Sequence, residues 1–205
     1  MSIRQNIRRF LFYGSLLALV VGLAMTAGFF ARRYKERQTQ LRVMAAFEEK
    51  IASAHQLDND HAYTGSMSTS HIDIPDGDTI AILELERLGI KVSIAQGIDR
   101  DVLHISAGHF PGTAMPGQGN FAIAGHSSMV YTCLFNDLHK AVVGDKIIVT
   151  TRTGRHKYLI SEIKVVSPTD TELLNPTRES IISIISCTNQ GRSRLFLKGI
   201  EIHDP

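Results

Sequence analysis

The stretch "SIISCTNQGRSRLFLKG", residues 183–199, joins two apolar runs through a short polar segment. β-branched and apolar residues lead directly into Cys187, and the second run begins at Arg194. Such runs favour strands, whereas Asn, Gly and Ser favour turns. The stretch therefore predicts a strand that ends at Cys187, a loop, and a second strand that opens with Arg194. The chain contains only two cysteines, so a cysteine at this junction is informative.

Short runs of the same kind recur from residue 79 onward. They are rich in Ile, Val and Leu and are separated by turn sequences such as "PGQGN", "VVGD" and "RTGR". Repeated short strands with turn signals predict a mainly β fold, either a barrel or a sandwich. Two segments, 99–106 and 134–141, are expected to form short helices. The expected strands are "TIAILEL", "IKVSIAQG", "NFAIAGH", "DKIIVTT", "KYLISEIKVV", "ESIISIISC" and "RLFLKGIEI".

The N-terminal part of the chain predicts a membrane anchor. Residues 10–30 form an uncharged run of 21 residues, long enough for a transmembrane helix and longer than the apolar region of a cleaved signal peptide. A buried core helix is the alternative. Basic residues lie on both sides of the run, so the charge pattern leaves its orientation open. We expect a short segment at 1–9, a juxtamembrane helix and linker over 31–78, and a folded domain over 79–205.

The overall composition argues against several classes of function. The chain has 205 residues, a formal net charge of +2, and no Trp. No cationic field or aromatic platform indicates nucleic-acid binding. The glycines of "PGQGNFAIAG" precede a strand, so they do not form a dinucleotide-binding turn. The histidines and cysteines lack metal-binding spacings, and no cofactor or metal is expected.

The two cysteines lie in different sequence environments. Cys133 is flanked by apolar residues in "MVYTCLFNDL" and has the pattern of a buried small side chain, whereas Cys187 is followed by polar residues. A nucleophilic cysteine requires partial exposure and a nearby histidine or cation. Cys187 is therefore the candidate nucleophile. A structural disulfide between Cys133 and Cys187 remains the alternative.

Two further residues are candidates for a site with Cys187. His126 ends the run "NFAIAGH" much as Cys187 ends "SIISC", so two strands would deliver reactive side chains at one rim of a barrel. Arg194 would bring a guanidinium to the same place, where it could stabilise an oxyanion. Arg192, two residues earlier, is a second choice for this role. Structural roles are expected for the other histidines considered, His104, His109 and His139.

Taken together, these residues resemble the sortase family of cysteine transpeptidases. "GNFAIAGH" is similar to the family's histidine strand, "SIISC" to its T-L-x-T-C strand, and "RLFLKG" to its arginine strand. "GHFPGTAMPGQGN" is similar to the family's approach to the histidine, and the resemblance covers about residues 79–202. Ser183 and Ser186 stand where threonines are usual, which keeps the hydroxyl group. Ile184 replaces the usual leucine.

The resemblance implies an eight-stranded β-barrel with short helices and a defined chemistry. Cys187 would be the nucleophile, His126 the acid/base, and Arg194 the donor to the substrate carbonyl. The substrate would be a surface protein with an LPXTG-like sorting signal, cleaved between Thr and Gly through a thioacyl enzyme. The acceptor would be an amine of a peptidoglycan precursor or cross-bridge. The domain would lie outside the membrane of a Gram-positive bacterium, held by a single N-terminal span.

Within the family, the sequence favours a class D-like anchoring enzyme. The linker lacks the Asp-Pro-aromatic lid that is usual in pilus-assembling members, and the insertion before the cysteine strand is short. A pilin-polymerising sortase is one alternative. A cysteine peptidase that hydrolyses its substrate is another, and a disulfide-bonded extracellular β-barrel binding module without catalysis is a third.

Overall fold

The computed structural model of the chain describes residues 3–60, 74–127, 134–188 and 191–203. Cys133 lies outside these residues, so the interpretation of its surroundings stays a prediction. The chain divides into two compact units, residues 1–38 and 39–205. The second unit contains all of the strands.

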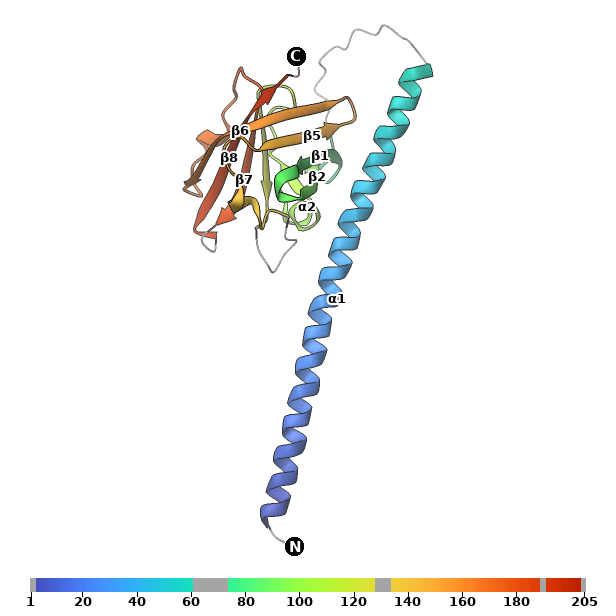
Figure 1. The fold of residues 1–205 in the computed structure, drawn as a ribbon, viewed down its shortest axis with the longest axis vertical. Coiled ribbons are helices and arrows are strands. Elements are labelled where there is room, and N and C mark those ends of the chain that lie inside the picture. The colour runs from blue at the N-terminus through green and yellow to red at the C-terminus, as the bar shows by residue number, and fades with distance from the viewer. Residues whose placement is uncertain (1–2, 61–73, 128–133, 189–190, 204–205) are drawn as a thin grey trace. The chain divides into compact units, whose positions relative to one another are not determined.

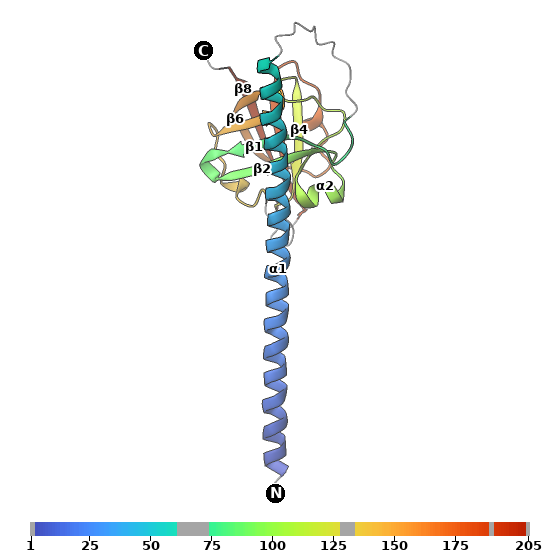
Figure 2. The ribbon, with the colours of Figure 1, turned by 90° about the vertical axis from the view of Figure 1, so that its right-hand side faces the viewer.

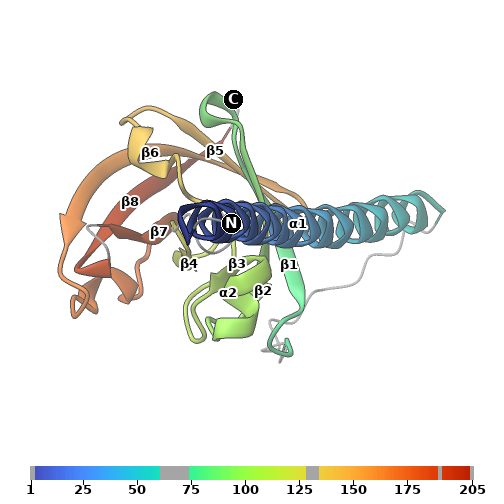
Figure 3. The same ribbon diagram turned by 90° about the horizontal axis from the view of Figure 1, so that it is seen from below.

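Eight strands close into a barrel in the order β1-β2-β3-β4-β7-β8-β6-β5. Seen from below, the strands follow one another around the barrel, with α2 beside β2 and β3 (Figure 3). This closed barrel confirms the mainly β fold. The strands are β1 Thr79–Leu85, β2 Ile90–Gln96, β3 Ala107–His109, β4 Asn120–Gly125, β5 Lys146–Thr151, β6 Arg155–Val166, β7 Ile181–Thr188 and β8 Ser193–Ile202.

Alternation of side chains along the strands builds the core. In β4, Phe121 and Ile123 point into the barrel, and in β7 the inward residues are Ile182 and Ile184. All four are fully buried. The side chains between them must point to the outer face, because successive residues of a strand alternate between faces. The sequence runs that predicted strands therefore also fix which residues face outward.

Seven of the strands lie where the sequence predicts them, each within two residues of the expected bounds. The eighth, β3, was missed because its three residues are too few to show a pattern. β1 and β2 form an antiparallel pair, seen from the side in Figure 2.

Of the two expected helices, 99–106 is confirmed as α2, Arg100–Ile105. Segment 134–141 contains only a turn of 3₁₀-helix, η2, Leu138–Lys140. The other 3₁₀ turns are η1 Glu86–Leu88 and η3 Glu172–Leu174.

The N-terminal helix α1 runs from Ile3 to Asp60 and is drawn as one continuous helix in Figure 1. The juxtamembrane helix is expected over 31–55 and the linker over 56–78, so α1 continues five residues into the expected linker. Residues 11–30 are all exposed. Among the described residues, α1 alone is long and apolar enough to cross a membrane.

The pairing that matters most for function joins strands far apart in sequence. β4 and β7 lie side by side and parallel, with Asn120 opposite Ile181 and Gly125 opposite Ser186. β8 then pairs antiparallel with the other edge of β7. The ends of three strands, two of them separated by about 60 residues, thus meet at one end of the barrel.

Candidate active site

The parallel pairing of β4 and β7 brings His126 and Cys187 together. The last pair in the register is Gly125 with Ser186, and the next residues along the chain are His126 and Cys187. His126 lies one residue beyond the end of β4, not at its last position as expected. Neighbouring strands lie about 4.8 Å apart, and residues in register point to the same face. Cys187 is half-buried, and its thiol is free. Strand β7 continues to Thr188, so Cys187 is the penultimate residue of its strand, not the last as expected.

Arg194 lies directly across from Cys187 on the other side. The two residues are partners in the antiparallel pairing of β7 and β8. Side chains of such partners have Cβ atoms about 4.5–5.5 Å apart. Nη1 of Arg194 donates hydrogen bonds of 2.9 Å to the carbonyl of Gly191 and 3.2 Å to that of Ser193. Pairing ends at Ser193, so Arg192 lies beyond the ladder.

The three candidate side chains share the outer face of the barrel wall. Inward positions are odd-numbered on β4 and β8 and even-numbered on β7, as Ile123, Ile184 and Leu197 illustrate. His126, Cys187 and Arg194 have the opposite parity. They therefore form one row across three adjacent strands.

Local contacts explain why the sequence around His126 takes this form. The ring of Phe135 lies 2.2 Å from where a Cβ on Gly125 would be, so only glycine fits before the histidine. The hydroxyl of Ser186 donates a 2.9 Å hydrogen bond to the carbonyl of Gly125 and joins the two strands beside the site. Ser186 stands where a threonine was expected, and its hydroxyl group makes this hydrogen bond. Ser127 donates to the carbonyl of Cys187, a second link between the strands.

His104 was expected to have a structural role, but it also lowers the pKa of His126. Burial lowers the pKa of His126 below its usual range, and the nearby His104 lowers it further. His104 lies on α2, whose residue Leu103 would approach a Cβ on Gly108 to 2.9 Å. Gly108 is paired with Ala124, two residues before His126 on the same outer face. The sequence gives no signal for this proximity, because it depends on how α2 packs against β3.

Replacing His104 with glutamine is expected to raise the pKa of His126 toward its usual value of about 6.5. The substitution removes a neighbouring ionisable side chain whose coulombic effect disfavours protonation of His126. NMR titration of the His126 ring protons would measure this directly. The wild-type midpoint should lie below that of His104→Gln. An unchanged or lower midpoint in the variant would contradict the coupling.

The other two histidines considered have places that fit structural roles. His109 is buried, with Nδ1 2.8 Å from Oε1 of Gln96 and Nε2 2.9 Å from Oγ1 of Thr113. Its ring stacks on Phe121. His139 is exposed in η2. Within the residues that the structure describes, no group of three or more His, Cys, Asp or Glu side chains could hold a metal ion.

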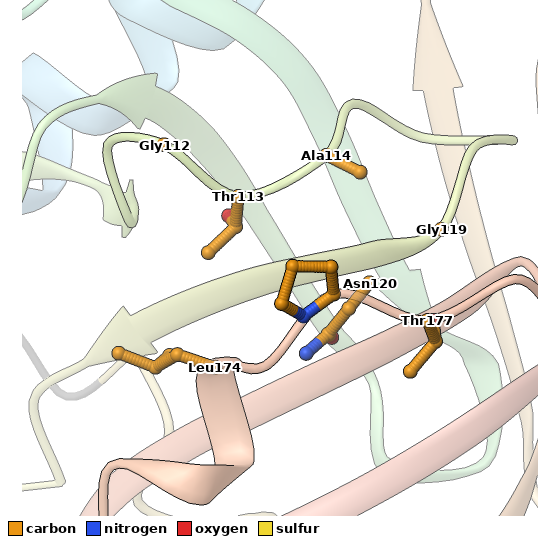
Figure 4. A pocket seen from close by; sticks show the side chains of 8 residues that line it. Gly112, Thr113, Ala114, Gly119, Asn120, Leu174 and Thr177 are labelled. Atoms are coloured by element: carbon orange, nitrogen blue, oxygen red, sulfur yellow. The ribbon is translucent and has the colours of Figure 1, made fainter.

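A hollow opens to solvent beside the start of β4 (Figure 4). It lies between the β3–β4 connection and the β6–β7 connection. Asn120, the first residue of β4, contributes to its lining together with Thr113 and Leu174. Asn120 has the same outward parity as His126, six residues further along the strand. The hollow and the candidate residues thus lie on one outer face of the barrel.

Comparison with known proteins agrees with this arrangement. The family model described as "Sortase domain" matches residues 83–200. Sortase A of Bacillus anthracis is 24% identical over 186 residues, which is 85% of each chain. Sortase A of Listeria monocytogenes is 31% identical over 71 residues, 35% of this chain and 32% of that protein. This chain therefore aligns with about a third of the Listeria protein.

Among solved structures, a sortase D5 transpeptidase from Clostridium perfringens is 35% identical, with a TM-score of 0.67. The match covers 81% of this chain and 99% of that one. The family model spans more than half of the chain, and the barrel matches that of a solved sortase. Family and fold together support a transpeptidase of the sortase kind. The chain belongs to the sortase family.

Proposed function

We propose that this protein is a membrane-anchored cysteine transpeptidase that cleaves an LPXTG-like sorting signal between Thr and Gly. The observation that carries the proposal is the row of His126, Cys187 and Arg194 across three paired strands. The row combines a thiol nucleophile, an acid/base and a cationic donor on one face. These are the groups that acyl transfer through a covalent intermediate requires.

The first half-reaction forms a thioacyl enzyme. His126 accepts the thiol proton of Cys187, and the resulting thiolate attacks the Thr carbonyl carbon. The guanidinium of Arg194 donates hydrogen bonds to the oxyanion that develops there. Collapse of this intermediate breaks the Thr–Gly bond. His126 gives its proton to the leaving glycine amine, so the departing group is neutral. The N-terminal part of the substrate stays bound to the sulfur.

The second half-reaction transfers the acyl group to an incoming amine. His126, now neutral, accepts a proton from the amine as it attacks the thioester, and the Cys187 thiolate leaves. The acceptor would be an amine of a peptidoglycan precursor or cross-bridge. The similarity to the Clostridium perfringens sortase D5 transpeptidase supports a class D-like anchoring enzyme. A pilin-polymerising enzyme would instead use a lysine side chain as the acceptor.

We propose that residues 10–30 anchor the protein in the membrane, with residues 1–9 in the cytoplasm. Residues 31–78 would connect the anchor to a catalytic domain formed by residues 79–205 outside the cell. The side chains of 11–30 are exposed and mostly apolar. A surface of this kind requires a cover, and a bilayer supplies one. Sortases are cell-surface enzymes of Gram-positive bacteria, which supports this orientation.

Arg194→Ala is expected to lower kcat/KM for peptide cleavage by about 10²–10³-fold, which is typical for the loss of one oxyanion donor. Arg192→Ala is the matched control and is expected to have a much smaller effect, because Arg192 lies outside the strand ladder beside Cys187. The rates of peptide consumption by the two variants test the assignment. Equal losses at both positions would contradict it.

Product analysis tests the proposed reaction against its rivals. Full-length protein in detergent micelles is incubated with LPXTG-like peptides, with and without a glycine or lysine amine. A transpeptidase joins the N-terminal fragment to the added amine, and the better amine distinguishes wall anchoring from pilin polymerisation. A peptidase releases only the free acid. A non-catalytic binding module leaves every peptide intact and shows no free thiols on titration.

A further inference from the structure

The connection between β6 and β7, residues 167–180, is held by a side chain on a distant strand. Apart from η3 it has no regular structure, and its backbone hydrogen bonds before Ser180 are short-range turns such as that from Leu174 to Thr171. At its end, the carbonyl of Ser180 accepts a 3.0 Å hydrogen bond from the backbone N–H of Glu201. The side-chain amide of Asn120 adds two long-range bonds. Its Nδ2 donates to the carbonyl of Leu173 at 2.9 Å and to that of Asn175 at 3.0 Å.

These two hydrogen bonds engage both protons of a buried amide group. Asn120 is only 3% exposed. The two acceptors flank Leu174, so the bonds fix the backbone on both sides of that residue. Such a contact is costly to break, because the buried amide of Asn120 would lose both of its acceptors. The amide therefore sets the position of Leu174 relative to β4.

The position of Leu174 matters because it borders the hollow. In Figure 4 the side chain of Leu174 extends alongside β4, in the direction in which the strand runs away from Asn120. That direction leads to His126. His126 lies six positions beyond Asn120 along the chain, or about 20 Å at a rise of roughly 3.3 Å per residue. Ala122 and Ala124 are the outward residues between them; Ala122 is fully buried, and Ala124 is partly exposed.

We propose that Asn120 is a positioning residue for substrate binding: its amide holds the β6–β7 connection against β4 and so fixes one wall of the hollow on the face of the barrel that carries Cys187. The inference rests on the proposed function, because it assigns the hollow to the acyl-donor peptide. A hollow with a fixed wall binds an extended peptide at a lower ordering cost than one whose wall must first be immobilised. The effect of Asn120 should thus fall on peptide binding, not on the chemistry of the thiol.

Asn120→Asp is the sharpest test, because it keeps the size and shape of the side chain. It removes both donors and places a carboxylate oxygen opposite two carbonyl oxygens. Gln118→Glu is the matched control. It makes the same chemical change two residues away, on an exposed side chain that does not line the hollow.

The variants are assayed as full-length protein in detergent micelles with an LPXTG-like peptide. Asn120→Asp is expected to raise KM by roughly 10-fold or more, because two buried hydrogen bonds are lost. We expect kcat to stay within about 3-fold of wild type. Alkylation of Cys187 by iodoacetamide, followed by peptide mass mapping, should proceed at the wild-type rate. Gln118→Glu should match wild type in all three measurements. An unchanged KM, or a fall in kcat with an equal fall in alkylation rate, would overturn the proposal.

Hydrogen–deuterium exchange provides a readout that does not depend on activity. The backbone amides of residues 171–177 should exchange at least about 10-fold faster in Asn120→Asp, while those of β4 and β7 keep wild-type rates. If this variant does not fold, Asn120→Ser, which keeps one donor, is measured in the same way and should show a smaller shift in KM and exchange. Unchanged exchange at 171–177 would overturn the inference. If wild-type protein cleaves no peptide, the proposed function fails while the exchange result still decides whether Asn120 holds the connection.

Discussion

Cys187→Ala is expected to abolish cleavage and transfer of every sorting-signal peptide. Alanine offers no nucleophile, so no thioacyl enzyme can form, and the remaining donors only bind substrate. Removing the nucleophile of a catalytic group that acts as a unit typically costs about 10⁴-fold or more in kcat. Quantification of the peptide products by liquid chromatography would measure this loss.

The position of Cys187 in the fold provides a folding control for the Cys187→Ala variant. Cys187 is half-buried at the end of a strand and its side chain lies on the outer face of the barrel, so truncation should leave the core intact. The thermal unfolding midpoint should stay within a few degrees of wild type. Substantial turnover by a folded Cys187→Ala variant would show that another residue is the nucleophile.

His126→Ala is expected to reduce turnover nearly as much, by about 10²–10⁴-fold. This is the usual contribution of a positioned general acid/base. Both half-reactions need a proton transfer at nitrogen, so thioacyl formation and amine transfer should each slow down. Mass spectrometry of samples quenched at successive times can follow thioacyl formation and amine transfer separately.

His139→Ala is the matched control for His126→Ala. His139 is exposed in η2, and its Nδ1 lies 2.7 Å from the carbonyl of Asn136. Its replacement should leave both steps within about 2-fold of wild type. Equal losses from the two histidine variants would remove His126 from the mechanism.

The local part of the fold could be predicted from the sequence. Runs such as "NFAIAGH" and "SIISC" mark strands because β-branched and apolar residues fit a pleated, half-buried surface. Strand β3 escaped prediction because Ala107, Gly108 and His109 carry no such preference. Pairing with β2 and β4 holds β3 in place, and the three residues of β3 do not by themselves predict this pairing.

The assembly of the site depends on pairing that no local pattern encodes. The sequence predicts that His126 and Cys187 end strands, but only the parallel register of β4 and β7 sets them side by side. The register of β7 and β8 likewise distinguishes Arg194 from Arg192, which are equivalent by parity alone. His104 and Asn120 act through contacts across the fold, the latter with carbonyls 53 and 55 residues away. Such contacts follow from the tertiary structure and not from spacing.

The central claim is that Cys187 carries the substrate as a thioester. Full-length protein in detergent micelles is mixed with an LPXTG-like peptide, quenched in acid within seconds, and analysed by intact-mass and tandem mass spectrometry. We expect an adduct equal in mass to the peptide up to its Thr residue, located on Cys187 and lost when an amine is added. Absence of any adduct across the peptide panel, together with a disulfide between Cys133 and Cys187, would contradict the account and favour a non-catalytic module.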